Sequence, residues 1–208
     1  MTLLQLLPTA QQITTITNHV NAYRAKHQAP PMTWAPAIAS VSQQWSYRLL
    51  STGAFEHSDT ANYGENLAQL KGYGTDLVTL YKKAIDLWYN EVALYNFSKP
   101  DFSPSTGHFT CLVWVASTSF GMGLTLDTTT NTVDIVMNTS PAGNFIGQFA
   151  QNVLPVTPMA PAAPLTPITN KQEIINELNN LIKELNANKR KSAVIADIQN
   201  VIQRLSSA

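Results

Sequence analysis

A proline at every third position divides this chain of 208 residues into two unlike parts. The repeat lies in residues 155–168, PVTPMAPAAPLTPI, and runs without a break from Pro155 to Pro167. Proline fixes φ and lacks a backbone donor, and a polyproline II helix has three residues per turn, so these rings share one edge. We expect a semi-rigid spacer about 40 Å long, or else an irregular linker. In either case the domain boundary lies here, between residues 1–154 and residues 169–208.

The residues after the spacer have a helical pattern of their own. Asn170 and Glu173 have the spacing of a capping box. Two stretches of apolar residues at helical spacing follow, and a basic KRK segment lies between them. The pattern predicts two amphipathic helices paired as a hairpin over 169–208, or one long helix with a stutter. Two short helices of this kind bury their apolar faces poorly alone, so we expect this segment to self-associate or to bind a protein partner.

The first part of the chain has the mixed periodicity of an α+β domain. Helical spacing of apolar residues is followed by short runs of β-formers, and the connection LDTTTNT between the last two runs is typical of a hairpin. The predicted helices cover residues 9–27, 35–51 and 75–95, and the predicted strands cover 112–117, 119–126 and 132–138.

Composition and charge exclude several classes of protein. The formal net charge is zero and charged residues make up 12% of the chain, which argues against nucleic acid as a partner. No apolar run reaches 18 residues, so we expect no transmembrane segment. One cysteine cannot form an internal disulfide, and the start MTLLQLLPTAQQ has no basic region typical of a signal peptide. The sequence therefore favours a cytoplasmic protein, or one exported by a nonclassical route.

Histidine and glutamate are scarce in the first part of the chain and lie in distinctive surroundings. His57 is in FEHSD, Glu65 in NYGENLA, Glu91 in LWYNEVALY and His108 in TGHFTCLVW. The last of these motifs also contains Cys111, the single cysteine.

These motifs resemble the signatures of the CAP superfamily, which includes cysteine-rich secretory proteins, antigen 5 and pathogenesis-related 1 proteins. YGENLA, WYNEVALYNFSKP, TGHFTCLVW and MNTSPAGNFIGQF occur in family order over about residues 10–155. The phrase NFSKPDFSPSTGHFT is most similar to the fungal, sterol-binding branch. The resemblance implies a three-layer α-β-α sandwich, the CAP fold, which would here be followed by the proline-rich linker and the helical hairpin.

The resemblance also implies a site. Family members have an open groove lined by two histidines and two glutamates, which correspond here to His57, Glu65, Glu91 and His108. Relatives hold a divalent ion, often zinc, between the two histidines, so His57 and His108 are the implied metal ligands and zinc an optional cofactor. Two neutral imidazoles can ligate zinc and leave positions for water, while carboxylates orient them. Alternatively, both imidazoles are protonated and paired with the glutamates without metal, or they only hold loops together.

This chain departs from the family pattern at the cysteines. Met122 and Met137 stand where secreted relatives have cysteines, so the disulfide-linked state of those relatives is not available. That departure puts secretion in doubt, and an extracellular location remains the alternative that the family suggests. Cys111 is expected to be a small buried hydrophobe. A thiol at this position could alternatively act as a third metal ligand or a redox nucleophile.

Three functions are compatible with the sequence. A non-enzymatic module that binds a lipid, a sterol or another small apolar ligand is favoured, and Tyr73 is the candidate ligand-loop residue. A metal-assisted hydrolase is the first alternative, with Glu65 or Glu91 as general base, although an HExxH helix is missing and no catalytic residue is assigned. A scaffold or oligomerisation protein acting through residues 169–208 is the second.

Overall fold

A computed structural model describes residues 2–59 and 62–156 of the chain. The chain consists of two compact units, Met1–Thr157 and Pro158–Ala208. The predicted spacer beyond Val156 and the predicted helices of 169–208 lie outside the described residues. Within the described ranges, no helix has the length and apolar character needed to cross a bilayer.

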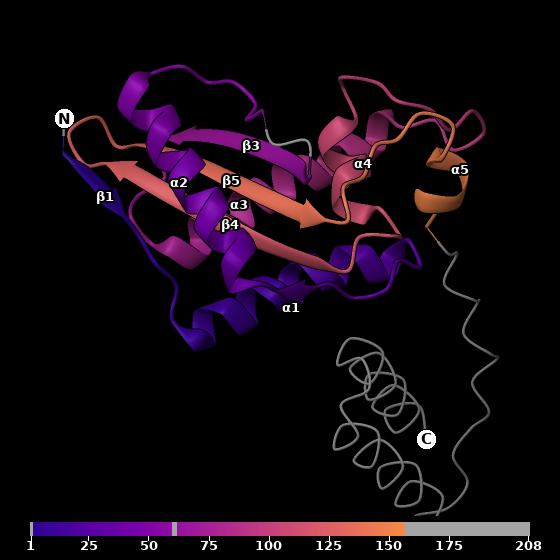
Figure 1. Cartoon of the computed structure of the whole chain (residues 1–208), viewed down its shortest axis with the longest axis horizontal. Helices are drawn as coiled ribbons and strands as arrows, with labels where there is room; N and C mark the ends of the chain where they lie inside the picture. Colours follow the sequence, from indigo (N-terminus) through magenta and orange to yellow (C-terminus); the bar gives the residue numbers. More distant parts are fainter. Residues whose placement is uncertain (1, 60–61, 157–208) are drawn as a thin grey trace, which may run out of the picture. The chain divides into compact units, whose positions relative to one another are not determined.

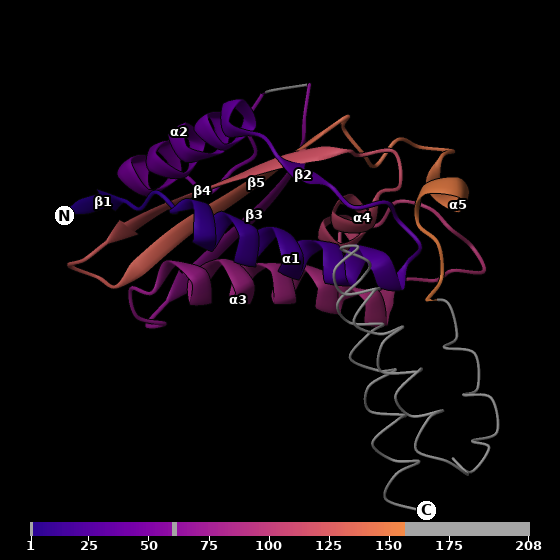
Figure 2. The same cartoon turned by 90° about the horizontal axis from the view of Figure 1, so that it is seen from below.

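The first unit has three layers, as the CAP resemblance predicted. Helix α2 (Pro36–Thr52) covers one face of the sheet, while α1 (Ala10–Lys26) and α3 (Leu77–Asn90) lie side by side on the other (Figure 2). Helices α1 and α2 agree with the predicted ranges to within one residue, because apolar residues at helical spacing face a buried layer. The third predicted helix, 75–95, is shorter in the structure, because α3 ends at Asn90 and a 3₁₀ turn follows it. The α+β sandwich is therefore confirmed.

The central sheet has five strands, mostly antiparallel (Figure 1). Its order is β1-β4-β5-β3, and a short β2 pairs parallel with β4, so β3 forms one outer edge. The β4–β5 hairpin was predicted, whereas β1, β2 and β3 were not. The strands span Leu3–Gln5 (β1), Thr33–Trp34 (β2), Gly64–Lys71 (β3), Ser119–Asp127 (β4) and Thr132–Ser140 (β5).

Two glycines on β4 allow α2 to lie directly on the sheet. A Cβ added to Gly121 would stand 2.1 Å from the backbone nitrogen of Ala39, and one added to Gly123 would stand 2.1 Å from that of Gln43. Contacts this short leave room only for hydrogen, so the glycines set the distance between helix and sheet.

The main apolar core lies on the opposite face, between the sheet and helices α1 and α3. Met122 and Met137 sit directly opposite each other on β4 and β5 and are 2% and 0% exposed. The methionines thus fill core volume where the resemblance places cysteines. The other large members of this core include Ile16, Val20, Leu80, Tyr81, Ile85, Trp88, Phe109, Leu112, Trp114 and Phe120.

The strand predicted for residues 112–117 is wrong. Residues Gly107–Val113 form helix α4 instead, and irregular backbone follows it. The run of β-formers misled the prediction because α4 is buried along most of its length, and a short apolar run does not distinguish a buried helix from a strand. His108 therefore lies on a helix and not at the entrance of a strand. A 3₁₀ turn, Glu91–Leu94 (η1), and a short helix, Phe149–Asn152 (α5), complete the described elements.

Candidate functional site

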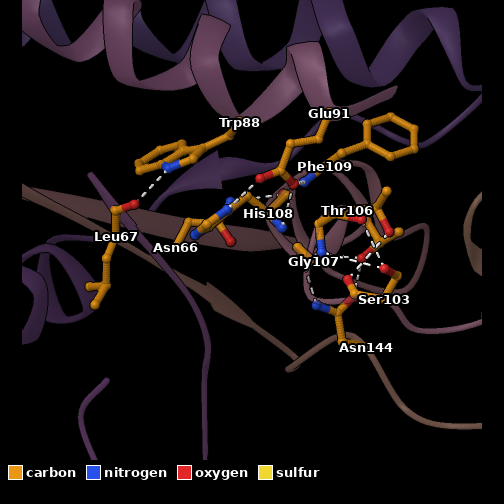
Figure 3. A network of polar contacts seen from close by, with 12 residues as sticks. Asn66, Leu67, Trp88, Glu91, Ser103, Thr106, Gly107, His108, Phe109 and Asn144 are labelled. Atoms are coloured by element: carbon orange, nitrogen blue, oxygen red, sulfur yellow. Dashed lines mark hydrogen bonds and ion pairs between the residues drawn. The ribbon is translucent and has the colours of Figure 1, made fainter. Parts of the chain in front are cut away.

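Glu91 organises the first half of the candidate site. It is the first residue of η1, and its Oε2 accepts hydrogen bonds from the backbone amides of His108 (2.9 Å) and Phe109 (3.0 Å). Its Oε1 lies 2.6 Å from Nδ1 of His108 (Figure 3). The N-cap residue Thr106 makes no side-chain cap bond. Glu91 therefore supplies the cap of α4 from another element and, with the same carboxylate, orients the His108 ring.

Two buried side chains hold His108 from the other side. The indole of Trp88 lies nearly parallel to the imidazole, with centroids 6.4 Å apart, and is itself fixed by a 2.9 Å hydrogen bond to the Leu67 carbonyl. The Asn66 amide donates to the carbonyl of His108 at 2.9 Å (Figure 3). Asn66 is 1% exposed, and its Oδ1 has no hydrogen-bond partner among the described residues.

Glu65 organises the second half. It is the second residue of β3, and its Oε1 accepts from Nδ1 of His57 (2.8 Å) and from the backbone amide of Ser58 (2.8 Å). Its Oε2 accepts from the Ser58 hydroxyl and, at 3.3 Å, from the amide of Asn138 on β5. The Glu65 side chain is 8% exposed and that of His57 63% exposed, so a buried carboxylate carries an imidazole that reaches solvent.

In the His57–Glu65 pair, each residue shifts the pKa of the other toward its charged form. Burial acts to raise the pKa of Glu65, but hydrogen bonds from His57, Ser58 and Asn138 outweigh it, and the pKa falls below its usual value. The hydrogen bond to Glu65 raises the pKa of His57, against the opposing effect of burial. The His57–Glu65 pair therefore keeps its proton on the imidazole to a higher pH than a free histidine would.

Two consecutive residues at the beginning of β3 belong to the surroundings of the two His–Glu pairs. Glu65 and Asn66 are consecutive, and strand geometry directs their side chains to opposite faces. Glu65 contacts Asn138, which accepts from Ser42 of α2 at 2.8 Å, whereas Asn66 contacts His108. No hydrogen bond or ion pair joins the two pairs directly within the described ranges. That the four side chains line one groove stays a prediction.

The two pairs offer two imidazole nitrogens as candidate ligands for a metal ion. In each pair Nδ1 faces a carboxylate, which leaves Nε2 as the ligating atom, the arrangement usual for histidines that bind metal. Among residues 2–59 and 62–156, however, no group of three His, Cys, Asp or Glu is placed to hold an ion. Two imidazoles are one ligand short of an ordinary catalytic zinc site, so water would complete the coordination.

Cys111 lies on α4 and is buried. Its Sγ is 3.6 Å from the Thr139 hydroxyl, it is 2% exposed, and burial raises its pKa to about 11. The thiol therefore has the properties of a small core residue rather than of a nucleophile.

Tyr73 follows the end of β3, whereas Glu65 lies at the beginning of that strand. It is 50% exposed in the loop between β3 and α3, and the Lys83 ammonium lies 5.3 Å from its ring centroid. No contact of Tyr73 with the four site residues is seen in the described part of the chain.

Sequence reasoning missed the residues that hold the site together. Asn66 stands in the quoted motif YGENLA, and Trp88 lies on a helix that was predicted, but neither was given a role. Ser58 and Asn138 were also missed. Ser58 stands in the quoted motif FEHSD and Asn138 in MNTSPAGNFIGQF, but neither was given a role. Their contacts with Glu65 depend on where β3 lies, and β3 was not predicted.

Comparison with known proteins bears on the family and the fold of the chain. The pattern of the cysteine-rich secretory protein family, CAP, matches residues 17–139. Protein PRY2 of Saccharomyces cerevisiae is 38% identical over 144 residues, which cover 69% of this chain and 41% of that protein. Golgi-associated plant pathogenesis-related protein 1 of Homo sapiens is 36% identical over 140 residues, which cover 65% of this chain and 87% of that protein.

Solved structures share the fold at lower identity. NaASP2, solved with Zn2+, has a TM-score of 0.55 at 18% identity, covering 71% of this chain and 85% of that one. BmVAL-1 has a TM-score of 0.55 at 17% identity, covering 71% and 82%. Identity this low supports the fold alone, and the chain spans less than half of PRY2, so neither comparison transfers an activity. From the family match and the relative covered almost throughout, we conclude that the chain belongs to the CAP, or cysteine-rich secretory protein, family.

Proposed function

We propose that residues 1–154 form a non-enzymatic binding module for a lipid or another small apolar ligand, with a His/Glu site able to hold a divalent metal. One observation carries the proposal: exposed apolar side chains adjoin the start of α4, beside the His108–Glu91 pair. Large exposed apolar side chains that gather at one place on a surface are typical of a binding site.

The apolar side chains come from two loops that meet at Gly107. Phe102 is 46% exposed, and its ring lies 3.4 Å from the position that a Cβ on Gly107 would take. Asn144 donates to the Gly107 carbonyl at 2.9 Å and accepts from the Thr110 hydroxyl at 2.7 Å. The two residues after Asn144 are Phe145, 50% exposed, and Ile146, 73% exposed. Both loops are thus fixed to α4 while presenting apolar groups to solvent.

An amphipathic ligand matches this combination. Its apolar part would lie on Phe102, Phe145 and Ile146, and its polar end would face the imidazole of His108. The similarity of NFSKPDFSPSTGHFT to the fungal sterol-binding branch supports a lipid or sterol. Tyr73 stays a candidate ligand-loop residue.

A divalent ion such as zinc would be held by Nε2 of His57 and His108. Such an ion would supply a positive centre for an anionic or hydroxyl head group. Only a neutral imidazole binds metal, and the pKa of His57 is raised by Glu65. Protons therefore compete with metal at His57, and affinity should fall as the pH is lowered.

A metal-assisted hydrolase is the weaker alternative. Both oxygens of Glu65 and both of Glu91 already accept hydrogen bonds. A carboxylate engaged in this way is a poor general base, because it must give up partners to take a proton.

The test is binding of cholesterol and of palmitate to the purified full chain. The double substitution Phe145→Ser with Ile146→Ser removes the apolar surface, and Leu87→Ser, at a 43% exposed position on α3, is the matched control. We expect the double variant to weaken binding at least about tenfold, since burial of each side chain contributes on the order of 1.5 kcal/mol, and the control to bind normally. Failure of both probes to bind, or binding unchanged in the double variant, would refute the proposal.

A further inference from the structure

The sequence contains two candidate acceptor tripeptides for N-linked glycans. Asn-Phe-Ser occurs at 96–98 and Asn-Thr-Ser at 138–140, and no other asparagine of the chain begins the pattern N-x-S/T. The tripeptide alone is a weak signal. Its surroundings in the folded chain separate the two positions clearly.

Asn96 lies in an exposed loop that is anchored on both sides. It follows η1, and both Asn96 and Ser98 are exposed. The residues that alternate with them point inward: Tyr95 is 8% exposed, its ring centroid is 4.9 Å from that of Phe97, and Phe97 is 6.2 Å from Phe109. The loop therefore presents the asparagine amide and the serine hydroxyl together, from a fixed base.

The backbone around Asn96 forms an Asx-turn. The amide of Ser98 donates to Oδ1 of Asn96 at 3.0 Å, and the amide of Lys99 donates to the Asn96 carbonyl at 3.1 Å. In such a turn the asparagine side chain folds back over the residue two positions later. The acceptor amide nitrogen, Nδ2, makes no hydrogen bond to the described residues and is available to react.

Asn138 has the opposite surroundings. It is 0% exposed in β5, between β3 and β4. Its Oδ1 accepts from the Ser42 hydroxyl at 2.8 Å and its Nδ2 donates to Glu65 at 3.3 Å. An attached glycan is bulky and hydrated, so it cannot be placed there in the folded domain.

We propose that Asn96 is an N-glycosylation site. The donor is an oligosaccharide linked to a lipid pyrophosphate, transferred by an oligosaccharyltransferase. A bond forms between Nδ2 of Asn96 and the anomeric carbon of the first sugar. The bond between that carbon and the pyrophosphate oxygen breaks, Nδ2 loses one proton, and the lipid pyrophosphate leaves.

The modification requires the chain to enter the lumen of the secretory route. It therefore agrees with the extracellular alternative and not with the cytoplasmic location that the sequence favours. The single thiol is no obstacle in an oxidising lumen, since Cys111 is buried and its pKa is raised to about 11.

The test is peptide mapping of the full chain from the cells that produce it, after glycan release by peptide-N-glycosidase in H2(18)O. We expect the 18O label at position 96 and none at position 138. Wholly unmodified Asn96, or label at position 138, overturns the proposal.

Variants secreted from a eukaryotic host behind a cleavable signal segment test the acceptor rule. Asn96→Gln and Ser98→Ala should lose the single glycan, whereas Ser98→Thr, which keeps the hydroxyl, should retain it. Asn138→Gln should leave the occupancy at Asn96 unchanged. Because Ser98→Ala and Ser98→Thr both keep Asn96, their comparison stays informative even if Asn96→Gln is poorly folded. A glycan that persists in Ser98→Ala contradicts the assignment.

Discussion

Replacing Glu91 by alanine tests whether one carboxylate both builds α4 and orients His108. Glu91 accepts from two backbone amides at 2.9 and 3.0 Å and contacts His108 Nδ1 at 2.6 Å. Its side chain is 20% exposed, so water replaces these partners only in part.

The expected loss of stability follows from these contacts. The α4 cap consists of the two amides that donate to Glu91, and leaving these partly buried donors without an acceptor costs about 1 kcal/mol each. We therefore expect Glu91→Ala to lower the free energy of unfolding by about 2 kcal/mol, which in a chain of this size lowers Tm by about 4–8 °C.

Differential scanning calorimetry of the full chain measures this loss. Glu56→Ala is the matched control, because Glu56 is exposed and its side chain makes no hydrogen bond or ion pair in the described ranges. Glu91→Gln separates the two roles: its carbonyl oxygen can still cap α4, but its NH2 donates to Nδ1 of His108 and moves the imidazole proton to Nε2. It should lose about 1 kcal/mol of stability and yet lose metal binding. If Glu91→Ala melts within error of Glu56→Ala, the reasoning is refuted.

Three further predictions concern helix packing, the His57–Glu65 pair and residues 169–208. Gly123→Ala puts a methyl group 2.1 Å from the Gln43 nitrogen and should abolish soluble expression. Gly53→Ala, at φ +73° in open space, should lower the free energy of unfolding by only about 1 kcal/mol. Equal behaviour of the two variants would contradict the account of helix packing. The contribution of the His57–Glu65 pair to the free energy of unfolding should be largest between about pH 4.3 and pH 6.5. The lowered pKa of Glu65 stabilises the folded state above the pKa of Glu in the unfolded chain, and the raised pKa of His57 stabilises it below the pKa of His in the unfolded chain. Urea unfolding of wild type and Glu65→Gln from pH 3 to pH 9 measures this, and a difference that does not vary with pH would speak against it. Residues 169–208 should mediate self-association, so light scattering should give a larger assembly for the full chain than for residues 1–155, and equal stoichiometry would exclude this role.

The sequence predicted the layers of the fold better than the details of the site. Helices α1, α2 and α3 follow from apolar spacing, and the β4–β5 hairpin follows from its turn. Strand β3 was missed: no element was predicted for residues 64–71, which pair with β5 along their whole length.

The composition of the site could be predicted, but its construction could not. The resemblance identified the two histidines and two glutamates, and the structure pairs each imidazole with one carboxylate. Asn66 acts on His108 across 42 positions of sequence, and Trp88 acts on it through a ring contact. Such contacts depend on how β3, α3 and α4 pack, and periodicity does not carry that information.

Isothermal titration of the full chain with zinc tests most directly whether the two His–Glu pairs serve one site. The account predicts binding of one ion, weakened at least about tenfold by His57→Ala and by His108→Ala, as the loss of one of two ligands implies. The double variant should be little worse than either single one. The control His19→Ala, which removes a histidine paired with Asp86 instead, should bind like wild type. Zinc binding that survives both substitutions, or that depends on only one of the two histidines, would contradict the account.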